Sequence, residues 1–326
     1  MVINLFEKGD GLQCLKEIYH LSDDQIKTIE DRVFEYENPP MSMAEIEALI
    51  SALRSSLGST EEEIKTIKAG LLDKSRKNRW PKCDCIEIFL KETGIKPDVF
   101  DVDNVMVHCK HISSSIDHGE SIRKHGLLKL TDLLETESPL SGFLREHGIK
   151  IIPSEYKINV RGNDKTLSQS SRAYGILYSK LYHDNGEVEV FISGDEKGLK
   201  KYSTVYRYPE ILCTLDQALN DNNILGWEWM NQKTETLMIQ FDAYLHECII
   251  HEMPSSKHDM KNYYALEDYL SGAYDGENIP HRFWENYWII ESCLKNSTSF
   301  EARPEAYAAI KKDVKISADR LSIEVI

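Results

Sequence analysis

The chain has 326 residues, of which 41% are hydrophobic and 29% charged, and its net charge is -15 from 39 Lys and Arg against 54 Asp and Glu. This length exceeds one ordinary compact core, so we expect two domains, or one large domain with an appendage. The acidic charge disfavours an extended nucleic-acid surface, and the absence of an apolar run near the roughly 18 residues of a membrane span predicts no membrane segment.

Cysteine usage and the first residues bear on the compartment. The seven cysteines are odd in number and scattered, which fits reduced thiols, and the opening MVINLFEKGDGLQ shows no export signal. We therefore expect a cytoplasmic protein. The basic stretch DKSRKNRWPK (73–82) could contact a phosphate backbone, but a solvated loop is the favoured interpretation of so short a run.

The first hundred residues are predicted to be helical. Two capping boxes, Ser22 with Gln25 and Ser42 with Glu45, begin helices, and Gly58 supplies a left-handed stop. Further helices are expected from residue 59 to about 72, and from the KCDC segment to about residue 94. A boundary near residue 100 then separates a helical N-terminal region, 1–100, from a second domain, 101–326.

Beyond residue 100, helix and strand patterns alternate. A helix is expected from Ser138-Pro139 to Gly148, where proline at the first helical position loses no hydrogen bond. The expected strands are 104–112, 149–160, 187–193, 236–250 and 314–326. Several of them alternate apolar and polar residues, which is typical of half-buried antiparallel strands and predicts the α+β class. The polar stretch 160–172 is predicted to be a mobile loop.

Two histidine and cysteine patterns resemble metal sites at first sight. In HECIIHE (246–252), His246 and His251 are five apart, whereas zinc proteases need the four-residue spacing that places both rings on one helix face. Cys83, Cys85, His108, Cys109 and His111 form a second group, but C-D-C is too short for a zinc pair, and a strand sends His108 and His111 to opposite faces. We therefore expect no metal.

A third constellation lies at the end of the strand expected at 104–112. His111 and Ser113 would project from one face of it, because strand side chains alternate, and GESIRKHGLL follows as a helix ended by Gly126. An imidazole and a hydroxyl on one face can bind a ribose diol or a carboxamide. This arrangement resembles the start of the catalytic domain of ADP-ribosyltransferases, in the branch with His, Tyr and Glu signatures that includes poly-ADP-ribose polymerases and DNA-modifying toxins.

The resemblance implies a fold and a set of site residues. It implies a mainly antiparallel split β-sheet over about 101–326, with NAD as the substrate bound by His111 and Ser113. SRAYGILYSKLY (171–182) is similar to the strand region of the second signature, with Tyr174 and Tyr178 as candidates to stack on nicotinamide. The third signature, a Glu that opens a late strand, is matched by Glu305, with Glu285 in reserve and Glu235 a distant third.

Each of these residues also has a structural explanation. His111 could be a histidine at the edge of the core, and the run Ser113–Ser115 could cap the next helix. Tyr174 and Tyr178, four apart, could form a packed helical stripe. Glu305 could be a first-turn charge on a short Ala-rich helix.

The resemblance implies transfer of ADP-ribose from NAD to a macromolecular acceptor, protein or nucleic acid, and a role as a toxin or defence effector. The helical region 1–100 is a candidate surface for a protein partner or inhibitor. One alternative is a catalytically inactive NAD-binding or ligand-sensing module on the same fold. Another is an NAD-using RNA phosphate-transfer enzyme, which requires a positive patch near His111, and the available residues are Arg123, Lys124, Arg145, Lys150 and Arg161.

Overall fold

The computed structural model divides the chain into two compact units. It describes residues 1–6, 9, 11–36, 41–58, 60–77, 79–82, 84–98, 100–183, 188–194, 199, 207–220, 224–251, 253, 264–274, 279–298 and 306–326. Unit 1 contains Ile3–Val102 and Met253–Arg303, and unit 2 contains Asp103–Glu252 and Pro304–Ile326. The first boundary lies close to the predicted residue 100, but residues 253–303, which were expected in the second domain, belong to unit 1.

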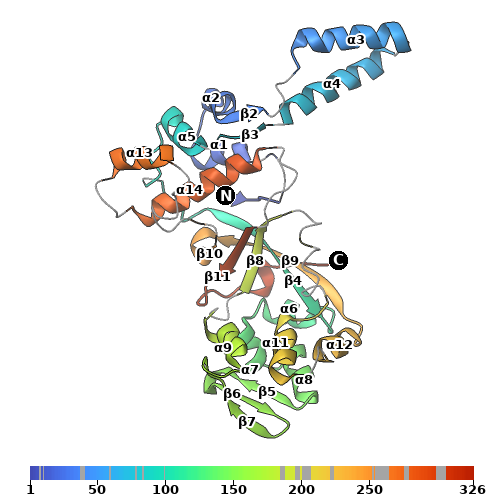
Figure 1. Ribbon diagram of the computed structural model, residues 1–326, viewed down its shortest axis with the longest axis vertical. Helices are drawn as coiled ribbons and strands as arrows, with labels where there is room; N and C mark the ends of the chain where they lie inside the picture. Colours follow the sequence, from blue (N-terminus) through green and yellow to red (C-terminus); the bar gives the residue numbers. More distant parts are fainter. Residues whose placement is uncertain are drawn as a thin grey trace. The chain divides into compact units, whose positions relative to one another are not determined.

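Unit 1 is mainly helical (Figure 1). Its helices are α1 (Gly11–Ile18), α2 (Asp23–Val33), α3 (Met43–Leu57), α4 (Glu61–Lys77), α5 (Cys85–Thr93), α13 (Tyr264–Ala273) and α14 (His281–Asn296), and its strands are β2 (Phe34–Tyr36) and β3 (Arg79–Pro81). Both predicted capping boxes are confirmed, and Gly58 ends α3 in the left-handed conformation. Arg79, from the basic stretch, pairs with Glu30 at 3.1 Å and lies over the Phe34 ring.

Contacts between α1 and α14 place α14 with the N-terminal helices, and the periodicity of the sequence does not predict them. Gly11 in α1 lies so close to this helix that an added Cβ would be 1.8 Å from the carbonyl oxygen of Cys293. The Tyr19 hydroxyl lies 2.8 Å from the buried Asn286 Oδ1. This packing joins segments some 270 residues apart, a long-range contact that local patterns do not reveal.

Unit 2 is built around an antiparallel sheet with the strand order β10-β11-β8-β4-β9-β12. The strands are β10 (Cys248–Ile250), β11 (Ala306–Ile310), β8 (Val188–Ser193), β4 (Met106–Ser115), β9 (Glu235–Tyr244) and β12 (Ser322–Val325), and the short strand β1 (Val2–Ile3) also pairs with β4. The longest pairing joins β4 to β9, from Met106 opposite Tyr244 to Ser115 opposite Glu235.

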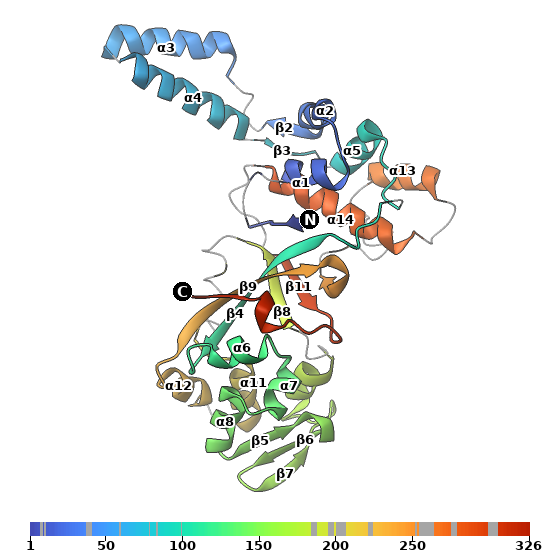
Figure 2. The same ribbon diagram turned by 180° about the vertical axis from the view of Figure 1, so that it is seen from behind.

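A second, three-stranded sheet has the order β5-β6-β7, from β5 (Ile149–Ile152), β6 (Lys157–Val160) and β7 (Asn163–Thr166). The helices of unit 2 are α6 (Glu120–His125), α7 (Leu130–Glu135), α8 (Pro139–Glu146), α9 (Gly175–Tyr178), α11 (Glu210–Leu219) and α12 (Ile224–Met230). In both views α7, α8 and α11 lie between the two sheets (Figures 1 and 2). Their apolar faces form one buried cluster with Ile149, Ile151 and Trp229.

The structure confirms the α+β class with mainly antiparallel sheets and N-terminal helices. Several local predictions are wrong. The basic stretch 73–82 was expected to be a solvated loop, but α4 continues to Lys77 and Arg79–Pro81 form β3. The expected loop 160–172 contains strand β7, since Arg161 and Gly162, both at positive φ, make a tight turn from β6. Within the segment 171–182, Gly175–Tyr178 form helix α9 and a π-helical turn follows at Ser179–His183, so the segment is not a strand. In the expected strand 314–326, only β12 is extended, at Ser322–Val325. Within the described residues, no helix is both long and apolar enough to cross a membrane.

Candidate functional site

His111 and Ser113 lie on strand β4, which has β8 on one side and β9 on the other. The pairing of β4 with β9 runs without a register shift, and His111 is opposite Ile239 while Ser113 is opposite Leu237. Because alternate side chains of a strand project from the same face, the two residues share a face with these buried apolar neighbours. The imidazole and the hydroxyl therefore meet a largely apolar surface of the sheet.

A backbone contact holds the His111 ring. Its Nδ1 lies 2.8 Å from the carbonyl oxygen of Glu189 in β8. A carbonyl only accepts, so Nδ1 carries the proton and Nε2 is left as an acceptor in the neutral ring. Burial lowers the pKa of His111, and the bond to Glu189 opposes that shift only in part. The geometry thus presents a neutral, oriented imidazole, suited to accept a hydrogen bond from a ribose hydroxyl.

The lowered pKa of His111 predicts a pH dependence of stability. A group with a folded-state pKa below its unfolded value of about 6.5 stabilises the fold above that value and loses this contribution as the pH falls toward the folded pKa. We expect the melting temperature of the wild type to fall more steeply than that of His111→Gln between neutral pH and about pH 5. Parallel slopes in thermal melts of the two proteins over that range would contradict the burial of a neutral imidazole.

The three consecutive serines have different surroundings. Ser113 is half-buried, and within the described part of the chain its hydroxyl has no hydrogen bond. Ser114, on the opposite face, donates to the Arg207 carbonyl at 3.1 Å and accepts from Trp229 Nε1 at 2.9 Å. Ser115 accepts from Gly119 N–H at 2.9 Å, at the entry of α6. Ser114 therefore has structural partners that are unrelated to helix capping, Ser115 bonds the N-cap residue of α6 rather than its first turn, and Ser113 keeps its capacity for a ligand.

The glycine that follows α6 fixes the path of the chain after the motif. Gly126 has φ +78°, and an added Cβ would be 2.2 Å from the Ile316 carbonyl oxygen, which accepts from Leu127 N–H at 2.9 Å. We expect Gly126→Ala to destabilise the protein by more than about 1 kcal/mol. Gly142, inside α8 with no atom near an added Cβ, is the control, since Ala there should stabilise by up to ~1 kcal/mol. Urea unfolding of both variants tests this, and equal midpoints would contradict it.

The late strand expected after Glu305 exists. Glu305 lies outside the described residues, and β11 begins at the next residue, Ala306. This rules out the Ala-rich helix for 306–310. Strand β11 pairs with β8, with Ala308 opposite Val190, and β8 pairs with β4 through Phe191 and Lys110. Strands β11, β8 and β4 are thus adjacent, and Ala308 and His111 are level across them.

The two other candidate carboxylates have described partners. Glu285 lies on α14 in unit 1, largely buried, 3.3 Å from Nδ1 of His281. Glu235 opens β9 and pairs with His118 at 2.9 Å. Glu305 directly precedes β11, which pairs with β8. Glu235 opens β9, on the other side of β4, and Glu285 lies in the other unit.

Tyr178 ends α9 and Tyr174 is its N-cap residue, and both pack against the buried cluster of helices in unit 2. The ring of Tyr178 is 4.8 Å from that of Tyr182 and 6.4 Å from that of Tyr156. This is the packed helical stripe that their four-residue spacing allowed. No contact in the described structure joins either tyrosine to His111 or Ser113, and their stacking role stays a prediction.

Sequence reasoning missed the polar surface on the other face of β4. His108 Nδ1 lies 2.8 Å from Asp242 Oδ1 in β9, and its Nε2 lies 3.3 Å from Gln240 Oε1. On the same face the rings of Phe191 and Tyr307 are 5.0 Å apart. The sequence signal was the alternation of β9, where Gln240 and Asp242 separate buried residues, but only the register reveals the partners.

The residues of the two rejected metal patterns that the structure describes lie apart or have other partners. His246 stacks on Tyr244 at 5.3 Å, and the His251 N–H donates to the Tyr307 carbonyl. Cys85 lies in unit 1 and His108, Cys109 and His111 lie in unit 2, while Cys83 is outside the described residues. Among the residues that the structure describes, no group of three His, Cys, Asp or Glu could hold a metal ion.

Two of the basic residues needed for RNA phosphate chemistry have partners of their own. Arg145 pairs with Glu137, and Arg123 donates to the His118 carbonyl. Two described cavities lie elsewhere in unit 2, one of about 330 Å³ against β5 and one of about 250 Å³ between α9 and α11, and His111 lines neither. Comparison of the chain with protein-family models, with curated proteins and with solved structures found no match.

Proposed function

We propose that unit 2 binds NAD against the His111 face of its large sheet and transfers ADP-ribose from it to a macromolecular acceptor. The observation that carries the proposal is the shared face of His111 and Ser113, with the imidazole oriented by the Glu189 carbonyl. The adjacency of β4, β8 and β11 supports it, because the residue before β11 is Glu305. The similarity to the ADP-ribosyltransferase signatures supplies the identity of the substrate.

The chemistry requires little from the protein. The bond between the ribose C1 and the nicotinamide nitrogen breaks, and its electron pair leaves with nicotinamide, which becomes neutral. A lone pair of an acceptor oxygen or nitrogen forms the new bond to C1, and the acceptor proton passes to the Glu305 carboxylate. The same carboxylate stabilises the positive charge that develops on the sugar, a contribution of several kcal/mol where water is excluded.

His111 and Ser113 have binding roles in this scheme. The free Nε2 of a neutral His111 accepts from a ribose hydroxyl, and the Ser113 hydroxyl bonds a second hydroxyl or the carboxamide. The apolar neighbours on this face, Ile239 and Leu237, are buried, which strengthens such bonds by lowering the local dielectric constant.

Binding of NAD is the first test. A ligand that binds only the folded state raises the unfolding free energy by RT ln(1 + [L]/Kd), or about 2.7 kcal/mol at a hundredfold excess over Kd. We expect the melting temperature to rise with NAD concentration and to respond far less to free adenine. Melting curves that NAD leaves unchanged up to millimolar concentration would refute the proposed binding site.

A further inference from the structure

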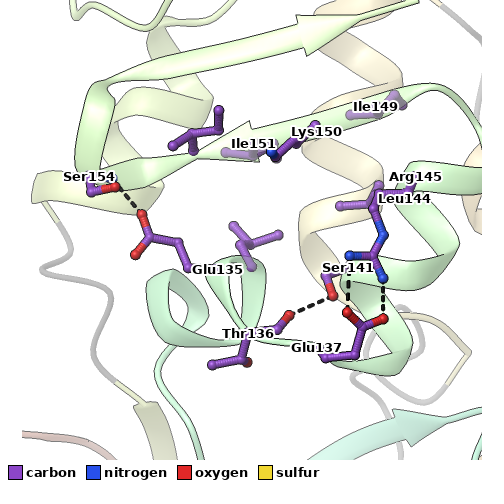
Figure 3. Close-up of a pocket in the computed structure, with 12 residues that line it drawn as sticks. Glu135, Thr136, Glu137, Ser141, Leu144, Arg145, Ile149, Lys150, Ile151 and Ser154 are labelled. Atoms are coloured by element: carbon purple, nitrogen blue, oxygen red, sulfur yellow. Dashed lines mark hydrogen bonds and ion pairs between the residues drawn. The ribbon is translucent and has the colours of Figure 1, made fainter.

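The larger described cavity of unit 2 opens along the outer edge of strand β5 (Figure 3). Its volume of about 330 Å³ is at the lower end of the range of small-ligand pockets. Leu134, Leu144, Ile149 and Ile151 give it an apolar lining, and all four are buried. Exposed charged residues surround this lining. The arrangement suits a ligand that has one apolar group with polar groups on either side.

The backbone of β5 carries unused hydrogen-bonding groups. The Arg161 N–H donates to the Gly148 carbonyl at 2.7 Å, and the register from Ile149 opposite Val160 to Ile152 opposite Lys157 is regular. In an antiparallel pair, bonded and non-bonded pairs alternate. Lys150 and Ile152 therefore bond β6, and the N–H and C=O groups of Ile149 and Ile151 point to the open edge.

These edge groups have no partner within the described part of the chain. β5 ends the three-stranded sheet, so no further strand covers them. A row of unpaired backbone groups two residues apart has the spacing of an added β-strand, and strand addition is a recurring way to bind an extended peptide. A small ligand would not need this spacing.

Charges at the cavity specify the chemistry of such a peptide. Arg145 and Glu137 neutralise each other in a two-pronged pair at the Ile149 end (Figure 3). Glu135, at the other end, accepts from the Ser154 N–H at 2.7 Å, and neither it nor Lys150 has an ion pair among the described residues. One unmatched negative and one unmatched positive charge therefore flank the apolar lining.

We infer that β5 binds an extended segment of a partner protein as an added strand, with an apolar side chain over Leu134 and Leu144, a basic side chain at Glu135 and an acidic one at Lys150. The cavity is independent of the proposed NAD face, and the test needs no NAD.

The experiment uses short random peptides displayed on phage and panned against the full chain, followed by synthesis of an enriched peptide. We expect enriched sequences to place basic and acidic residues around an apolar one. Glu135→Lys should weaken binding of the enriched peptide by about tenfold. The control Glu155→Lys should not weaken it, because Glu155 pairs with Lys157 outside the cavity. The double variant Glu135→Lys/Lys150→Glu should prefer the peptide with its two charges exchanged.

Hydrogen exchange gives a second readout that does not depend on the variants. In the free chain the amides of Ile149 and Ile151 should exchange faster than those of Lys150 and Ile152, and the peptide should slow the first pair by at least about tenfold. A bound peptide that leaves these two amides unchanged, or panning that enriches equally on Glu135→Lys, would overturn the inference. If exchange of these amides slowed with rising protein concentration and without peptide, and sedimentation showed dimers, the edge would bind a second copy of the chain. This result would also overturn the inference.

Discussion

Replacing Glu305 by glutamine should lower the rate of nicotinamide release from NAD by about 10² to 10³ while NAD still binds. Glutamine keeps the shape of the side chain but removes the negative charge that would stabilise the developing sugar cation. It also removes the base that accepts the proton of the attacking group. A substitution of this kind acts on the transition state, so kcat should fall with little change in KM.

Two matched variants distinguish Glu305 from the other candidates. Glu285→Gln alters a carboxylate in unit 1 that pairs with His281, and Glu235→Gln alters one that pairs with His118. Both should leave nicotinamide release within about twofold of the wild type, since each of these carboxylates pairs with a histidine that has no part in the proposed site. Loss of release in Glu285→Gln with normal release in Glu305→Gln would reverse the assignment of the catalytic carboxylate.

The second large effect is expected at His111. His111→Ala removes the acceptor proposed for the ribose and should weaken NAD binding by about tenfold or more, as the loss of a buried hydrogen bond does. The matched control is His108→Ala, because His108 lies on the same strand but projects from the opposite face, toward Asp242. Calorimetric titration of both variants with NAD gives the two affinities.

His111 also has a structural bond to Glu189, so the variant loses some stability. Urea unfolding without ligand measures that loss separately from the loss of affinity. If His108→Ala weakened NAD binding as much as His111→Ala, binding would not depend on the face that His111 and Ser113 share. The proposed site would then be on the wrong side of the sheet.

Local chemistry allowed several elements to be predicted. Ser22 and Ser42 each cap a helix with the expected partner three residues later, and Pro139 begins α8, because capping depends on residues within one turn. The alternation in VEVFIS predicted β8, in which Val188, Val190 and Ile192 are buried and only the final Ser193 breaks the alternation. These predictions needed no knowledge of distant contacts.

Local patterns were insufficient for segments whose conformation depends on contacts with distant parts of the sequence. For Ala306–Ile310 the strand was expected only from the family resemblance, while the local pattern also allowed an Ala-rich helix; the segment is extended because β8 and β10 pair with it on either side. Residues 163–166 are polar and exposed, and β6 makes them a strand by pairing. The stripe of Tyr174 and Tyr178 has helical spacing, and the strand prediction came from the family resemblance rather than from that spacing.

The candidate site was predicted in part. The shared face of His111 and Ser113 followed from the period of a strand, but the bond from Nδ1 to Glu189 depends on the pairing of β4 with β8, which no local pattern gives. The unpaired edge of β5 is also a property of the sheet order, and the sequence shows only a short alternating stretch there.

Release of nicotinamide by the full chain is the decisive measurement for the proposed transfer of ADP-ribose. The purified protein would be incubated with NAD labelled in the nicotinamide ring, and free nicotinamide would be separated and counted, with Glu305→Gln as the reference. Nicotinamide should accumulate in the wild type, with an equal amount of ADP-ribose attached to the protein, to an added acceptor or to water. Release no faster than in Glu305→Gln, from a protein that is folded by its melting curve, would contradict the proposed transfer.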